Sequence, residues 1–308
     1  MAIADDSSAS PVVGQGAGTS VLPAAYAAAA LAMLIWGGTP TAVRLAVDGI
    51  DPLTAGILRT VLAAVVVLPL ALILGLPRPK GSRQWLLLLG SGAGVFIGFP
   101  LLFSVGIKET SVAHASLINA AIPLFTGLFG AIAERRIPGR WWVTGVVIAL
   151  VGEALLIGFR DVGNDGVTLR GDLLCLASSV CSGFGYVTGA RLSLKIGSRA
   201  SIFWGISVAG LIQLPLLYSL WDATDWSMVP ATSYGAIIYM ASFSTVIGFI
   251  AWYWALNKAG IVRMAPIQFS MPIISLTLAV LVFNESLSLP IVLSGIIILS
   301  GIAISRRG

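Results

Sequence analysis

Hydrophobic residues follow one another along this chain in long blocks, and short polar gaps separate the blocks. Each block comes close to the ~20 residues that an α-helix needs to cross the hydrocarbon core of a bilayer. The blocks are too long for strands, and they lack the one-sided apolar stripe of a soluble helix. The pattern predicts ten transmembrane helices, at residues 24–47, 52–75, 84–107, 110–133, 141–158, 168–190, 201–220, 231–256, 261–283 and 289–305.

The composition supports an all-α membrane protein that is surrounded by lipid. Hydrophobic residues make up 57% of the 308 residues and charged residues only 10%, whereas soluble domains carry roughly 25% charged residues. The net charge of +5 could indicate a nucleic-acid partner, but in a membrane protein excess Lys and Arg marks cytoplasmic loops. We therefore expect no nucleic-acid partner.

The basic residues also predict the orientation. Gaps after the even-numbered helices, together with the C-terminus, carry 13 Lys and Arg residues, and gaps after the odd-numbered helices carry 3. Both termini are therefore expected in the cytoplasm, with the protein in the plasma membrane, the inner membrane of a bacterium. Residues 1–23 are rich in Ser, Ala, Gly and Pro and lack the basic start of a cleavable signal. They are predicted to form a disordered cytoplasmic tail.

The two cysteines do not indicate a disulfide or a metal site. Cys175 and Cys181 lie six residues apart in one apolar block, so a helix would point them in different directions. No metal and no cofactor is expected.

An internal repeat divides the chain into two halves. The stretch VFIGFPLLFSVGIK, residues 95–108, aligns with TVIGFIAWYWALNK, residues 245–258, at a constant offset of 150. The halves, residues 24–160 and 168–305, thus correspond five helices to five. Because five is odd, the second half must enter the membrane inverted. Inverted repeats are typical of secondary transporters, whose substrate site lies between the halves near the membrane midplane.

Short motifs open and close each half. Trp36-Gly37 is followed by Arg44, Pro52 and Arg59, and GDLLCLASSVCSGFGYV, residues 171–187, opens the second half. Pro272, Glu285 and Gly295 close the second half. Over residues 24–305 the chain resembles the EamA-type repeat of the drug/metabolite transporter superfamily. The resemblance implies ten helices in two inverted repeats and the export of amino acids, other metabolites or drugs. The Thr39-Pro40 pair departs from the usual pattern, in which no proline follows Trp-Gly.

In each half a side-chain amide precedes a proline by four residues. These pairs are Asn119 with Pro123 and Gln268 with Pro272. Since proline has no N–H, each helix should expose a free carbonyl beside an amide. Hydrocarbon tolerates such groups only where protein or water meets them, so we expect them to line the cavity. The alternative is a packed proline kink whose amide joins two helices.

Hydroxyl and aromatic side chains follow helical spacing in further spans. The candidate substrate-binding residues are Trp36, Thr39, Phe99, Asn119, Ser178, Ser182, Tyr186, Ser242, Thr245, Trp252 and Gln268. The set offers hydroxyls, amides and aromatic faces but no charge near the midplane, which disfavours substrates of high net charge. For any single serine, a close contact between helices is an equal alternative.

Glycines and prolines are expected to shape the helices. Gly37, Gly38 and Pro40 predict an interrupted first helix that bends, and Pro123 and Pro272 predict similar bending points. Other mid-span glycines are expected to let helices pack closely: Gly90, Gly94, Gly98, Gly185 and Gly189.

Arg44, Arg59 and Glu153 are charged residues inside the predicted spans whose roles need an explanation. Arg44 lies about one turn from the outer end and is expected to reach Asp48. Arg59 lies deeper and needs a partner, for which Asp51 or Asp48 is the candidate. Glu153 is the only acid well within a span, and we expect it to have a structural role rather than one in proton coupling.

These features favour a secondary exporter of small neutral or zwitterionic solutes, with amino acids first and aromatic or apolar ones preferred. A passive channel or facilitator for small metabolites, or a multidrug efflux carrier, is the alternative. An enzyme is not expected: His114, the only histidine, lies near the outer surface, about 15 Å from Ser182 at ~1.5 Å per residue. The sequence leaves proton coupling open. It also leaves open a homo-oligomer, because small-residue faces serve packing within and between subunits alike.

Overall fold

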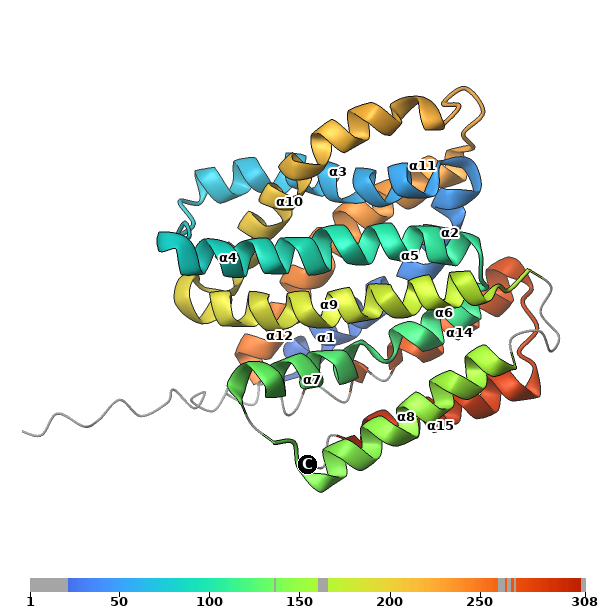
Figure 1. Ribbon diagram of the computed structural model, residues 1–308. Coiled ribbons are helices and arrows are strands. Elements are labelled where there is room, and N and C mark those ends of the chain that lie inside the picture. Colours follow the sequence, from blue (N-terminus) through green and yellow to red (C-terminus); the bar gives the residue numbers. More distant parts are fainter. Residues whose placement is uncertain are drawn as a thin grey trace, which may run out of the picture.

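The computed structural model describes residues 22–135, 137–159, 166–259, 264, 267–268 and 270–305, without the side chain of Asn257. Within these residues the chain is helical and contains no strand. The long helical segments, several of which consist of two or three consecutive helices, lie side by side, and successive segments run in opposite directions (Figure 1). Nearly all of the predicted N-terminal tail lies outside the described residues.

The elements of the first half follow the predicted blocks closely. In chain order they are α1 (Leu22–Gly37), α2 (Thr39–Gly49), α3 (Pro52–Ile73), α4 (Gly81–Ser91), the π-helix η1 (Gly92–Gly98), α5 (Phe99–Lys108), α6 (Val112–Asn119), α7 (Ile122–Glu134) and α8 (Arg140–Gly158). The elements of the second half are α9 (Leu169–Ile196), α10 (Ser198–Leu220), the short 3-10 helix η2 (Trp221–Ala223), α11 (Ala231–Ile238), the π-helix η3 (Tyr239–Ile247), α12 (Gly248–Ala259), α14 (Ser270–Phe283) and α15 (Leu289–Ser305).

Eight helical segments within the described residues are long and apolar enough to cross a membrane. They coincide, within a few residues at most ends, with the first eight predicted blocks. The two further apolar helices, α14 and α15, are shorter, and residues 260–263, which belong to the ninth predicted block, lie outside the described residues. The molecule is therefore an all-helical, multi-pass membrane protein.

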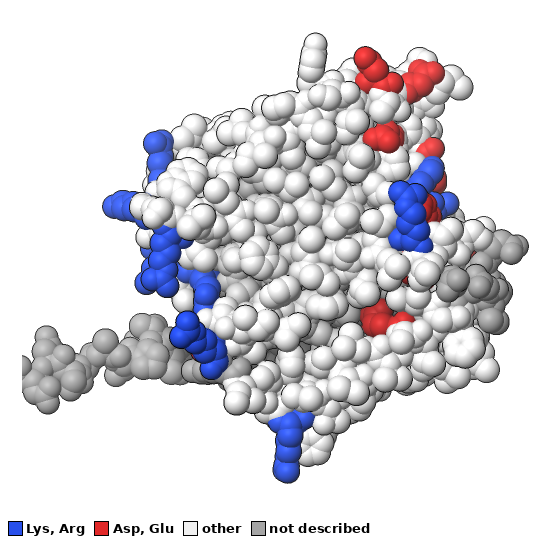
Figure 2. All heavy atoms as spheres, in the orientation of Figure 1, with Lys and Arg blue, Asp and Glu red and all other residues white. Residues whose placement is uncertain are grey.

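Charged residues collect at the two ends of the helix bundle. Figure 2 shows most Lys and Arg at one end of the visible face, and Asp and Glu with a few further Lys and Arg at the other. We call the first the basic end; it holds the turns after α3, α7 and α9, with Arg78, Lys80, Arg83, Arg135, Arg140, Lys195 and Arg199. We call the second the acidic end; it holds the turns after α2, α5, η2 and α14, with Asp48, Asp51, Glu109, Asp222, Asp225 and Glu285.

Glycines allow pairs of helices to pack with their backbones in contact. A Cβ added at Gly94 would lie 2.7 Å from the Cα of Gly185, which brings η1 against α9. A Cβ added at Gly145 would lie 2.4 Å from the carbonyl oxygen of Gly301, where α8 packs against α15. The prediction that Gly94 and Gly185 are packing positions is confirmed.

Both halves contain a π-helix at the repeated Ile-Gly-Phe sequence. The N–H of Phe99 donates to the carbonyl of Gly94, and the N–H of Gly248 donates to the carbonyl of Phe243. These bonds span five residues, so each turn holds more residues than an α-helical turn. Side chains before and after each π-helix therefore lie on different faces from those that α-helical spacing predicts.

The helix interruptions differ in size. At the predicted break in the first span only Gly38 lies outside the helices, and the N–H of Ala42 still donates to the Gly38 carbonyl. The fourth span is divided more fully, because α6 ends at Asn119 and α7 begins at Ile122, just before Pro123.

Candidate functional site

A buried arginine lies between the two halves of the protein. Arg59, on α3, is only 8% exposed. Its Nε donates a hydrogen bond of 3.1 Å to the Thr245 hydroxyl, and its Nη2 donates one of 3.2 Å to the Ser244 hydroxyl. The guanidinium carbon lies 5.8 Å from the centre of the Phe99 ring, a cation–π contact. Arg59 therefore connects α3 and α5 of the first half to η3 of the second.

The prediction that Asp51 or Asp48 pairs with Arg59 is wrong. Asp51 caps the start of α3 and accepts from the Thr54 N–H at 2.8 Å. Asp48 forms an ion pair with Arg44, at 3.4 Å, as predicted, and another with Lys108, at 3.7 Å. Both carboxylates are thus engaged at the acidic end, and the partners of Arg59 are neutral hydroxyls. The sequence also predicted that no charge lies among the binding residues. The structure contradicts this, because the Arg59 guanidinium contacts Phe99 and Thr245.

The guanidinium of Arg59 keeps one donor group unused. Its Nη1 is buried and has no hydrogen-bond partner among the described residues. A buried charged donor without an acceptor costs free energy, about 1–3 kcal/mol or more. This nitrogen is suited to receive a further acceptor, above all an anionic one that can also balance the charge.

Polar and aromatic groups from α1 and α2 complete the surroundings of Arg59. The Thr39 hydroxyl lies 2.9 Å from the Ser244 hydroxyl, and the Trp36 indole donates to the Ser244 carbonyl at 3.0 Å. We call this set the central arginine site; its residues are Trp36, Thr39, Arg59, Phe99, Ser244 and Thr245. It brings together four of the predicted binding residues, Trp36, Thr39, Phe99 and Thr245, with two residues that were not proposed as binding groups.

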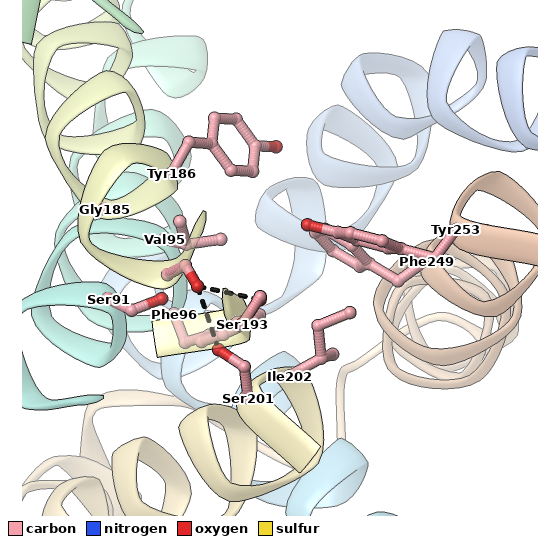
Figure 3. Close-up of a pocket in the computed structure, with 11 residues that line it drawn as sticks. Ser91, Val95, Phe96, Gly185, Tyr186, Ser193, Ser201, Ile202, Phe249 and Tyr253 are labelled. Atoms are coloured by element: carbon pink, nitrogen blue, oxygen red, sulfur yellow. Dashed lines mark hydrogen bonds between the residues drawn. The ribbon is translucent and has the colours of Figure 1, made fainter. Parts of the chain in front are cut away.

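A narrow cleft lies near this site, between η1, α9, α10 and α12. Figure 3 shows the side chains that line it. It is lined by Ser91, Val95, Phe96, Gly185, Tyr186, Gly189, Ser193, Ser201, Ile202, Phe249 and Tyr253. The hydroxyls of Ser193 and Ser201 both donate to the Gly189 carbonyl, at 2.8 and 3.2 Å. Tyr186, a predicted binding residue, lines the cleft together with Phe249, which packs edge-on against Trp36, 5.2 Å between ring centres. Phe249 and Trp36 therefore connect the cleft to the central arginine site.

The cleft is too small for an organic solute in this conformation. Its volume is about 20 Å³, which is room for one or two water molecules. The helices around it must separate before a solute can pass.

Other predicted binding residues have partners within the protein. The Asn119 amide oxygen accepts from the Ser179 hydroxyl at 2.9 Å, which joins α6 to α9. This contact matches the packing alternative for the amide. The Ser178 hydroxyl donates to the carbonyl of Cys175, on its own helix, at 2.6 Å. Trp252 is 8% exposed and packs edge-on against Trp36, 6.1 Å between ring centres.

The remaining predicted binding residues lie outside the central arginine site. Ser182 is buried on α9, Ser242 is half-buried on η3, and Gln268 is half-buried in the short turn before α14. α-Helical spacing selected Ser242, whereas the π-helix turns Ser244 towards Arg59. Ser244 was missed because the sequence does not reveal where a π-helix replaces an α-helix.

The predicted bending points also take part in packing. The Gly37 carbonyl accepts from the Ser275 hydroxyl at 2.7 Å, and the Ile35 carbonyl accepts from the Tyr239 hydroxyl at 2.6 Å. A Cβ at Gly37 would lie 2.7 Å from Ile274, so this glycine lets α14 approach. Pro40 and Pro272 are buried and Pro123 is exposed. A role for these positions in gating stays a prediction.

Comparison with known proteins finds relatives over nearly the whole chain. The uncharacterised transporter YdeK of Bacillus subtilis (strain 168) is 32% identical over 279 residues, which are 90% of this chain and 95% of that protein. A probable amino-acid metabolite efflux pump of Escherichia coli (strain K12) is 25% identical over 299 residues, covering 91% of this chain and 94% of that protein.

A solved crystal structure shares the fold. It superposes with a TM-score of 0.63 at 21% identity and covers 92% of this chain and 98% of its own. The EamA-like transporter family matches the chain twice, over residues 23–158 and 169–307. The protein is therefore a membrane transporter and not an enzyme, and it belongs to the EamA-like transporter family.

Proposed function

We propose that this transporter exports small zwitterionic solutes that carry one carboxylate, with amino acids first and aromatic or apolar ones preferred. The unused Nη1 of Arg59 is the observation that carries the proposal. A solute carboxylate there would accept from Nη1 and balance the buried charge of Arg59. Charge-assisted hydrogen bonds of this kind are roughly twice as strong as neutral ones.

The other groups of the site suit the rest of such a solute. The Thr39, Ser244 and Thr245 hydroxyls supply acceptors for an ammonium group, and the carboxylate of the same solute offsets its repulsion by Arg59. Phe99 and Trp36 supply aromatic faces for an apolar side chain, and Phe249 packs edge-on against Trp36, 5.2 Å between ring centres. An amino acid with an aromatic or aliphatic side chain fits this division of polar and apolar groups.

The names of two relatives support the export of amino acids, and the charge of the site argues against the export of cationic drugs. Relatives from Escherichia coli and Salmonella typhimurium are each named a probable amino-acid metabolite efflux pump. The positive charge of Arg59 would repel cationic drugs, which argues against multidrug efflux as the main activity.

We also propose that the chain crosses the membrane ten times as two inverted halves, with the basic end in the cytoplasm. Three features support this topology. Each half has a π-helix at its Ile-Gly-Phe sequence, and in each half a helix begins one or two residues before a proline, α7 before Pro123 and α14 before Pro272. α1 packs against α12, and its counterpart in the second half, α9, packs against α5. The excess of basic residues at one end supports the orientation.

Transport would then proceed by alternating access. In this conformation the cleft lined by Tyr186 and Phe249 is too narrow for a solute. Rocking of one half against the other would widen the cleft for loading from the cytoplasm and then open the acidic end for release.

Counterflow into proteoliposomes tests the proposal. Vesicles preloaded with unlabelled phenylalanine or leucine are expected to accumulate the labelled amino acid transiently and saturably. The matched probes are the corresponding amino-acid amides, which keep the ammonium group and side chain but lack the carboxylate, and they are expected to be poor substrates. Equal transport of acid and amide would contradict the role of Arg59, and linear uptake without counterflow would favour a channel.

A further inference from the structure

A second group of buried titratable residues lies at the acidic end, away from the central arginine site. We call it the acidic-end cluster; its residues are His114 of α6, Glu153 of α8 and Asp172 of α9. Asp172 has no exposed surface. One carboxylate oxygen accepts from the Thr110 hydroxyl at 2.5 Å, and the other lies 3.2 Å from Nδ1 of His114. Asp172 therefore has partners for both oxygens.

Glu153 is buried without such partners. It is 3% exposed, and neither carboxylate oxygen has a hydrogen-bond partner among the described residues. Nε2 of His114 is likewise buried and unpartnered. Glu153 also lies close enough to Asp172 for the two carboxylates to interact electrostatically.

Within the part of the chain that the structure describes, the helices around Glu153 bring no cation to it. α15, which packs along α8, has no titratable residue from Leu289 to Ser305. α6 contributes only His114, and α9 contributes Asp172, a carboxylate, and Cys175, a thiol. The described cations nearby are engaged elsewhere at the acidic end, Arg170 with Glu109 and both Arg44 and Lys108 with Asp48.

Charge balance then requires a proton. One histidine can neutralise at most one of the two carboxylates. A second ionised carboxylate, buried and without a donor, is strongly disfavoured, and such a group binds a proton instead. Since Asp172 has the hydrogen bonds, Glu153 is the residue that holds this proton.

Contacts at the acidic end enclose the cluster. The Glu285 carboxylate accepts from the N–H groups of Val112 and Ala113, at 2.7 and 2.9 Å, and so holds the start of α6. The Lys108 ammonium donates to the Val47 carbonyl at 2.7 Å, which ties α5 to α2. Release of a solute at this end requires these elements to separate, and water would then reach the cluster.

We propose that Glu153, supported by His114 and Asp172, is a proton-binding site whose occupancy is linked to closure of the acidic end. When this end closes, the Glu153 carboxylate takes up one proton from water and becomes a neutral carboxylic acid. When the end opens, the solvated acid releases the proton to water. The inference requires that the transporter opens at the acidic end, but it is independent of which solute is carried.

The sign of the pH effect follows from this linkage. The closed state binds the proton more tightly, so acid favours closure and alkali favours opening. One linked proton changes the equilibrium between open and closed states by at most about tenfold per pH unit.

Thiol labelling without any solute tests the linkage. In a Cys175→Ala/Cys181→Ser background, Ala46→Cys places a reporter at a fully buried position of α2 near the acidic end. Ser227→Cys, at an exposed position in the turn after η2, corrects for the pH dependence of the thiol itself. The corrected maleimide labelling rate of the buried reporter is expected to rise several-fold per pH unit, and Glu153→Gln is expected to abolish that rise.

Matched variants and a second measurement decide the outcome. Glu109→Gln removes an acid of the same end that pairs with Arg170, and it should leave the pH dependence intact. Infrared difference spectra should contain the carbonyl band of a buried carboxylic acid at neutral pH, and this band should be missing in Glu153→Gln.

The proposal is overturned if wild-type labelling does not respond to pH, if Glu153→Gln keeps the response, or if the band persists in that variant. Should Glu153→Gln fail to fold, Glu153→Asp, which keeps the titratable group, replaces it and must preserve both signals.

Discussion

The central arginine site and the acidic-end cluster both bury charge inside one helical bundle, but they stabilise it in different ways. Arg59 remains a cation in any protein environment, and it is surrounded by hydroxyls and an aromatic ring with one donor left over. Glu153 has no donor among the residues that the structure describes, but it can lose its charge by binding a proton. A buried group that stays charged selects an anionic ligand, whereas a buried group that can be neutralised responds to pH.

The two sites also join different helices, so the proposed roles in solute binding and in closure of the acidic end fall on different parts of the bundle. The central arginine site joins the two halves through side chains of α3 and η3. The acidic-end cluster joins α6 to α9 through His114 and Asp172. The two sites should therefore respond to different perturbations, and substitutions that affect one should leave the other largely unchanged.

The largest effect is expected from Arg59→Gln. Glutamine keeps a neutral donor but removes the charge, so the loss of a charge-assisted hydrogen bond should cost about 2–3 kcal/mol of solute binding. This corresponds to a roughly 100-fold rise in the KM for amino acids, measured by uptake into proteoliposomes. Arg59→Lys keeps the charge without the planar fork, and an intermediate KM is expected. An unchanged KM in Arg59→Gln would remove Arg59 from the binding site.

The second-largest effect is expected in the acidic-end cluster, where the two carboxylates should contribute differently to the free energy of unfolding. Asp172→Ala leaves the Thr110 hydroxyl and Nδ1 of His114 buried without their partner and should lower the free energy of unfolding by about 2 kcal/mol. Glu153→Leu removes a carboxylate that makes no hydrogen bond, so it should leave stability nearly unchanged or raise it. Thermal unfolding in detergent compares the two. Equal destabilisation by both substitutions would contradict the difference between a paired and an unpaired carboxylate.

The smallest effect is expected from the hydroxyls. Thr245→Val removes the acceptor of the Arg59 Nε and should raise the KM about fivefold, which is ~1 kcal/mol. Thr245→Ser, which keeps the hydroxyl, should restore near-normal transport. Ser178→Ala is the matched control, because that hydroxyl bonds to its own helix and should change the KM by less than about twofold. A larger effect of Ser178→Ala than of Thr245→Val would reverse the assignment.

Sequence patterns identified the nature of the fold and part of the site. Trp36, Thr39, Phe99 and Thr245 were selected from the sequence, and the structure places them around Arg59. The sequence did not identify Ser244 as a binding residue, because the π-helix η3 changes the rotation per residue along the helix. Arg59 itself was recognised as buried, but its partners lie 185 and 186 residues away, where no local pattern could indicate them.

The sequence by itself determined that this chain is a bundle of membrane helices with an internal repeat and an uneven distribution of basic residues. These properties depend on the length and spacing of apolar blocks, and the bilayer imposes them on each segment separately. Only the tertiary structure decided which buried charges meet. It placed Arg59 against the hydroxyls of η3 and His114 against Asp172, because contacts between distant helices depend on the rotation and approach of each helix.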